Sequence, residues 1–235
     1  MNIDKPWISG PRELLIHGIQ HLDLNTGFDY RIAMISIDNS LELMIKTHLG
    51  LPKRISKIEG ITRKKYEEIT SSFPNLLDGI EEFSNDKLDG IDLGDIEWFH
   101  RLRNQLYHDG NGITVEKEKV EAYAEIAKIL FGNLFGIEIE DTGNETLHYS
   151  LVGEFIKEWA NLEKQNLQEN ASFKAPIHRL REMLESGELS NSQAKQFDEL
   201  RKFRNNLVHG MSSPTEKDLK KHLIELKDIN KALNK

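Results

Sequence analysis

Apolar residues recur every three or four positions along most of the chain, which is the spacing typical of amphipathic helices. Glycine, proline and asparagine interrupt this pattern at intervals and mark where helices end. In the first half of the chain, Thr114 is placed to cap the last helix. The predicted helices of this half cover about residues 12–24, 28–49, 62–71, 75–83, 96–108 and 114–135, with a loop over residues 84–94.

The second half repeats this plan in fewer residues. Ser190 or Asn191 is expected to cap one helix, and Thr215 and Asp218 resemble a capping box at the start of another. The predicted helices cover about residues 147–168, 176–185, 191–209 and 216–233. Between the halves, two glycines and alternating apolar and acidic residues predict a linker over residues 136–146, with at most a short strand. We therefore expect an all-α fold of two helical bundles in tandem, residues 1–136 and 147–235.

One segment occurs twice and sets this architecture. Residues 96–108 and 197–209 align without a gap at an offset of 101 residues, with apolar residues coinciding at four positions. Both copies contain the sequence Arg-Asn-x-x-x-His near the end of a predicted helix. A repeat at a fixed offset indicates a duplicated structural unit. The candidate site residues are the arginine, asparagine and histidine of this sequence in the two copies: Arg103, Asn104, His108, Arg204, Asn205 and His209.

These residue types at this spacing could cleave RNA without a metal. Asn104 and His108 are four residues apart, so they share one face of a helix. Histidine can act as base for the 2′-hydroxyl or as acid for the leaving 5′-oxygen, and the helix C-terminus favours its protonated form. Arginine is a planar donor to phosphate oxygens. Two such motifs facing each other would supply a complete set, with 2′,3′-cyclic phosphate and 5′-hydroxyl ends as products.

The two arginines stand at an unusual position for a charge. Each lies about 50° from the centre of its helix's apolar stripe at about 100° per residue. A guanidinium there needs either an acidic partner or an aqueous cleft. The same exception in both copies favours a polar cleft beside the core. On that reading, replacing Arg103 or Arg204 with alanine should change stability little, and an ordinary helix end with a structural ion pair is the alternative.

The duplicated motif resembles that of the HEPN superfamily, a set of small helical bundles marked by arginine, a polar residue and a later histidine. The resemblance implies a metal-independent endoribonuclease of prokaryotic defence or a toxin–antitoxin system, and its alternative is a non-catalytic module that binds a protein or nucleotide. It also implies a site where two motif helices meet, so His108 and His209 are expected to face one cleft in a monomeric pseudo-dimer. A homodimer that pairs each motif with its own copy is the alternative. Gly110 and Met211 stand where one branch of the family carries a modifiable tyrosine, which argues against control by adenylylation there.

The net charge of −8 excludes a general nucleic-acid coat, because such proteins are basic. RNA contact would need a local basic patch, and a solvated loop and helix face is the alternative interpretation of the same residues. The candidate RNA-binding residues are Lys53, Arg54, Lys57, Arg63, Lys64 and Lys65, with Arg101 and Lys202 in the motif helices. The family resemblance implies RNA as the substrate and an antitoxin or a defence-system protein as the partner.

The remaining features predict a cytoplasmic protein without disulfides, metal or cofactor. The chain has no cysteine, no apolar run of membrane-spanning length and no N-terminal signal pattern. His17, His21 and Asp23 are near one another in sequence but match no metal motif, so we expect no metal and no cofactor. Asp38 and Glu42 could form an acid pair, but a solvated face of the long helix is the favoured interpretation.

Overall fold

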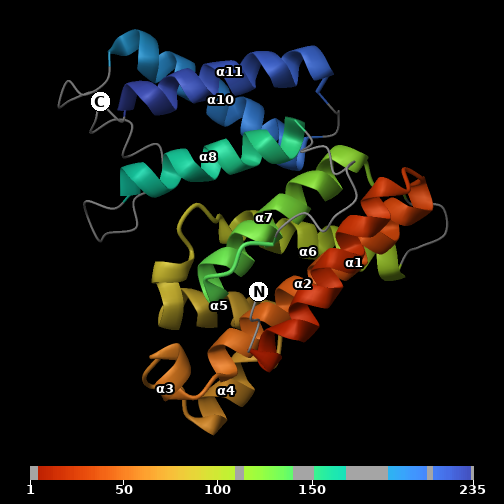
Figure 1. The fold of residues 1–235 in the computed structure, drawn as a ribbon, viewed down its shortest axis with the longest axis vertical. Coiled ribbons are helices and arrows are strands. Elements are labelled where there is room, and N and C mark those ends of the chain that lie inside the picture. The colour runs from red at the N-terminus through yellow and green to blue at the C-terminus, as the bar shows by residue number, and fades with distance from the viewer. Residues whose placement is uncertain (1–4, 109–113, 140–150, 168–189, 211–213, 234–235) are drawn as a thin grey trace. The chain divides into compact units, whose positions relative to one another are not determined.

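The computed structural model describes residues 5–108, 114–139, 151–167, 190–210 and 214–233. All regular elements in these ranges are helices, which confirms the predicted all-α class. The chain divides into two compact units, Met1–His148 and Tyr149–Lys235, and each is described by itself (Figure 1). No helix in the described ranges is both long enough and apolar enough to cross a membrane.

The first unit is organised around one long helix, α2. Its helices are α1 (Ser9–Asp23), α2 (Gly27–Gly50), α3 (Lys53–Ser56), α4 (Arg63–Ile69), α5 (Phe73–Ser84), α6 (Leu93–His108) and α7 (Lys117–Phe135). Short 3-10 turns, Pro6–Ile8 and Asn85–Lys87, precede α1 and follow α5. Helix α2 packs against α1, α5, α6 and α7, so it is buried on most of its circumference.

Close approach of α1 to α2 depends on Gly18. A Cβ atom at this position would lie 2.8 Å from the Ile37 side chain and 3.2 Å from the carbonyl oxygen of Ala33. Because Gly18 has no side chain, the backbone of α1 can pack directly against the Ile37 side chain of α2. Across the core, the Phe99 ring of α6 stacks on the Tyr123 ring of α7 with centroids 4.4 Å apart, and both residues are fully buried.

The second unit contains α8 (Leu151–Leu167), α10 (Asn191–His209) and α11 (Glu216–Leu233) in its described part. Aromatic pairs join α8 to α10: Phe155 lies 5.3 Å from Phe203, and Trp159 lies 5.5 Å from Phe197, between ring centroids. The side chain of Ser190 accepts from the backbone of Gln193 in a full capping box, so Ser190 is the cap of α10. Thr215 and Asp218 exchange hydrogen bonds as predicted at the start of α11.

The helix bounds differ from the sequence prediction at a few points. Thr114 does not cap α7: the N-cap residue is Glu116, which makes no side-chain capping bond. Residues 137–139 form no strand, and Gly136 ends α7 in the left-handed conformation at φ 67°. Several predicted features lie outside the described residues: the glycine-containing stop at 109–112, the rest of the linker at 140–146, and the helix at 176–185.

Acid should destabilise the first unit through His48. This residue of α2 is 3% exposed and its Nε2 lies 3.1 Å from the Ser84 hydroxyl. Burial lowers its pKa from 6.5 to about 4. Below pH 6.5 the unfolded chain therefore binds a proton that the folded chain does not, and stability is lost as pH falls towards 4. Between pH 7 and 5, this difference amounts to about 2 kcal/mol.

Urea unfolding at pH 7 and pH 5 measures this loss. The variant His48→Gln keeps an amide donor for Ser84 but cannot titrate, so its stability should fall by about 2 kcal/mol less than that of the parent chain over the same interval. An identical pH dependence in the two chains would show that His48 is not the group responsible.

Candidate functional site

The site in the first unit is built around Asp38, whose side chain is fully buried in the middle of α2. Its Oδ2 atom lies 3.0 Å from Nδ1 of His100 on α6. The hydroxyl of Tyr123, on α7, donates to Oδ1 at 2.7 Å. A carboxylate only accepts hydrogen bonds, so Nδ1 of His100 carries the proton in this contact. Asp38 thus links three helices through one buried charge.

Arg103 completes this network from α6. Its Nε lies 3.3 Å from Oδ2 of Asp38, an ion pair rather than a well-aligned hydrogen bond. One terminal nitrogen donates to Oδ1 of Asn39 at 2.5 Å, and the other donates to Oδ1 of Asn104 at 2.9 Å. The guanidinium also lies 5.6 Å from the centre of the Tyr107 ring. With its side chain 18% exposed, Arg103 is held in one orientation at the edge of the core.

Two aromatic residues fix the polar groups of this network. The Phe73 ring stacks on the His100 imidazole with centroids 3.6 Å apart and planes 4° from parallel. Burial raises the pKa of Tyr123 well above its ordinary value, and the charge of Asp38 raises it further. The Tyr123 hydroxyl therefore stays protonated and remains a donor at any physiological pH. His100, Tyr123 and Arg103 thus each have an aromatic neighbour as well as a polar partner.

His108 lies at the open end of the same helix. It is the last residue of α6, it is exposed, and its ring meets the Tyr107 ring edge-on at 5.2 Å. Nearby, the Arg31 guanidinium of α2 donates to the carbonyl oxygen of Leu106 at 3.4 Å. The structure brings Arg103 and Asn104 into direct contact and leaves the imidazole of His108 accessible to solvent, as an acid or base for an external substrate must be.

The second copy of the motif differs in its surroundings. Arg204 is buried at 7% exposed, while Asn205 and His209 are exposed and His209 again ends its helix. Position 201, which corresponds to His100, is an arginine that donates to Asp198 one turn earlier at 2.9 Å. Hydrogen bonds from Lys202 and Arg201 lower the pKa of Asp198.

The candidate RNA-binding residues are mostly exposed and partly neutralised. Lys53 pairs with Glu59 at 2.7 Å and Arg63 with Glu67 at 3.0 Å, while the Lys65 ammonium lies 3.4 Å from Glu82. In the motif helices, Arg101 pairs with Glu97 and Lys202 with Asp198. Of the candidate RNA-binding residues, the exposed Arg54, Lys57 and Lys64 form no ion pair with any described residue.

The expectations for Asp38 and Arg103 need correction. Asp38 does not lie on a solvated face, because it is fully buried and bound to His100, Arg103 and Tyr123. Arg103 lies in an ion pair rather than in an open cleft, so its replacement by alanine is now expected to destabilise the fold. Asp38 does not pair with Glu42, which instead bonds Lys46. The overlooked signal was periodicity: Asp38 follows Met34 by four residues and precedes Leu41 by three, within the apolar face of α2.

No group of three or more histidine, aspartate or glutamate side chains in the described ranges is arranged to hold a metal ion. His17 and His21 meet edge-on, with ring centroids 4.8 Å apart. His21 Nδ1 lies 3.0 Å from Oδ1 of Asp29, which fixes its ring on α1.

No family model, curated protein or solved structure matches the chain.

Proposed function

We propose that the chain is a metal-independent endoribonuclease of the HEPN type. The observation that carries this proposal is a guanidinium, that of Arg103, which three protein oxygens hold in place on the same helix that ends in an exposed imidazole, that of His108. Positive charge that is already oriented stabilises a developing phosphate charge without further reorganisation. The duplicated motif, which supplies a second arginine and histidine, supports the same reading.

The roles follow from the chemistry of each group. One histidine takes the proton of the ribose 2′-hydroxyl, the oxygen attacks the adjacent phosphorus, and a second histidine protonates the leaving 5′-oxygen. A guanidinium has five N–H donors. Two of those of Arg103 donate to Asn39 and Asn104, and its Nε–H lies beside Asp38, which leaves two on the terminal nitrogens for phosphate oxygens. Asn104 orients Arg103 through its side-chain oxygen. Asp38 acts as a positioning residue, since it contacts Arg103 and not the substrate.

The proposed setting is prokaryotic defence or a toxin–antitoxin pair, in which a protein partner would restrain the enzyme. RNA would approach through local basic residues, because the chain as a whole is acidic. Among the candidate basic residues, the exposed Arg54, Lys57 and Lys64 have no acidic partner among the described residues, so their charges are the most available to RNA phosphates.

A non-catalytic helical module that binds a protein or nucleotide partner is the second candidate. Two observations favour it: Arg204 is 7% exposed, and the guanidinium of Arg103 is already engaged by Asp38, Asn39 and Asn104. Arginines of this kind could serve the fold alone.

Expression in a bacterial host separates the two functions. The intact chain should stop growth and fragment cellular RNA, while a chain with both His108→Ala and His209→Ala, produced at the same level, should do neither. Because both histidines are exposed, the double variant should fold normally. Growth arrest by both chains, or RNA that stays intact under the wild-type chain, would favour the non-catalytic module.

A further inference from the structure

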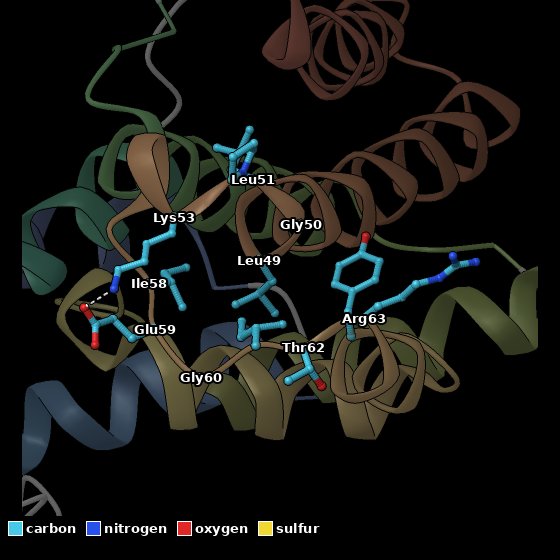
Figure 2. A pocket seen from close by; sticks show the side chains of 12 residues that line it. Leu49, Gly50, Leu51, Lys53, Ile58, Glu59, Gly60, Thr62 and Arg63 are labelled. Atoms are coloured by element: carbon cyan, nitrogen blue, oxygen red, sulfur yellow. Dashed lines mark ion pairs between the residues drawn. The ribbon is translucent and has the colours of Figure 1, made fainter.

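A cavity of about 550 Å³ opens at the C-terminal end of α2, beside α3 and α4. Its volume lies within the range of small-molecule sites in proteins. Figure 2 shows Leu49 and Ile58 in the middle of the pocket, with Lys53 on one side and Arg63 on the other. Asp38 lies twelve residues before Gly50, or about 18 Å along the helix, so the cavity is separate from the motif network.

The local sequence keeps this cavity open. Gly50 ends α2 against Tyr66, where a Cβ atom would lie 3.1 Å from the ring. The chain then turns back through two left-handed residues, Lys57 at φ 60° and Gly60 at φ 87°. The Tyr66 hydroxyl donates to the carbonyl oxygen of Lys46 at 3.1 Å, which fixes the ring as one wall. The result is a preformed recess with an apolar floor and an aromatic side.

The chain segment around the cavity is strongly basic, and its charged lining residues are Lys53, Arg63 and Glu59. Six basic residues and one acidic residue, Glu59, give residues 50–66 a net charge of +5 in a chain whose net charge is −8. Lys53 pairs with Glu59 and Arg63 with Glu67, but all four side chains are more than 60% exposed. Exposed pairs of this kind contribute little free energy, so a phosphate could displace the carboxylates. The charge therefore favours an anionic ligand.

We propose that this cavity binds a nucleotide. The base would lie on the apolar floor of Leu49 and Ile58 beside the Tyr66 ring, and the phosphate would bind Lys53 and Arg63. Stacking on an aromatic ring and ion pairing with phosphate are the two interactions that nucleotides offer together. The inference is independent of RNA cleavage by the motifs. The nucleotide could be a free molecule or one unit of a single strand, since both present the same groups.

Calorimetric titration of the full chain tests this proposal. The probes are adenosine 5′-monophosphate, adenosine, inorganic phosphate and a twelve-residue oligoadenylate, the last with the His108→Ala, His209→Ala chain so that it is not cut. We expect the monophosphate to bind at least tenfold more tightly than adenosine or phosphate. Lys53→Ala and Arg63→Ala should each weaken binding about tenfold, which is the loss of one charge-assisted contact. Lys117→Ala removes a cation of α7 that neither lines the cavity nor belongs to the candidate RNA-binding residues, and should change the affinity less than twofold.

The two sources of the nucleotide give different results. A free ligand is indicated when the monophosphate binds alone. A strand is indicated when only the oligoadenylate binds and Lys53→Ala still weakens it. The proposal is overturned if neither the monophosphate nor the oligoadenylate binds. It is also overturned if inorganic phosphate binds as tightly as the monophosphate, or if binding is unchanged in Lys53→Ala and Arg63→Ala. None of these outcomes depends on whether the chain cleaves RNA.

Discussion

Replacing His108 or His209 with alanine is expected to lower the rate of RNA cleavage by about 10²- to 10⁴-fold, the usual contribution of a general acid or base. Both side chains are exposed at the ends of their helices, so the free energy of unfolding should change by less than about 0.5 kcal/mol. Purified single variants, assayed on a labelled RNA in the presence of a chelator, measure the rate. His17→Ala removes another exposed helical histidine and should retain the parent rate.

The single variants also test how the motifs are used. If both histidines serve one site, each single variant is inactive, and mixing the two restores nothing. If each motif instead pairs with its own copy in a second chain, each variant keeps one intact kind of site and retains substantial activity. Full activity in both single variants would remove the histidines from the mechanism altogether.

Asp38→Asn is expected to cost about 3 kcal/mol of folding stability, the loss typical of breaking a buried ion pair on one side. The asparagine would offer one acceptor oxygen to His100, Arg103 and Tyr123 together, and its NH₂ group would face donors. Denaturant unfolding at neutral pH measures the change. Asp78→Asn, an exposed aspartate of α5, is the matched control and should change stability by less than about 0.5 kcal/mol.

A double-mutant cycle shows whether the loss belongs to the pair. Arg103→Ala should also be destabilising, because it leaves the buried carboxylate short of one partner. Since the two residues act through one contact, the double variant should lose less stability than the two single changes added together. Additive losses, or a loss below about 1 kcal/mol in Asp38→Asn, would show that the network does not hold the motif helix in place.

The helices could be predicted because each has a local signal. The apolar period marks α1, α2, α6 and α11, and Ser190 and Thr215 mark helix starts through hydrogen bonds with residues three positions on. The predicted start of α7 was wrong because no side chain caps this helix: Glu116 occupies the N-cap position without a capping hydrogen bond. Thr114 has the right chemistry, but α7 begins only at Lys117.

The candidate site was less accessible to prediction because its contacts are long-range. The repeat identified Arg103 and Asn104, but two of the partners of Arg103, Asp38 and Asn39, lie on α2, and Asn39 is 64 residues away in the sequence. The burial of Asp38 could not be predicted from its residue type, because an aspartate is rarely buried unless it has partners, and the partners of Asp38 are known only from the fold. His100 and Tyr123 lie outside the Arg-Asn-x-x-x-His pattern, and the residue aligned with His100 in the second copy is Arg201.

The chemistry of the cut RNA ends tests the central proposal most directly. The wild-type chain, incubated with a defined RNA and excess chelator, should produce fragments that end in 2′,3′-cyclic phosphate and begin with 5′-hydroxyl, as mass spectrometry of the fragments would show. These ends form only if the 2′-hydroxyl is the nucleophile and water is not. Fragments with 5′-phosphate and 3′-hydroxyl ends, or cleavage that stops when the metal is chelated, would contradict the proposal.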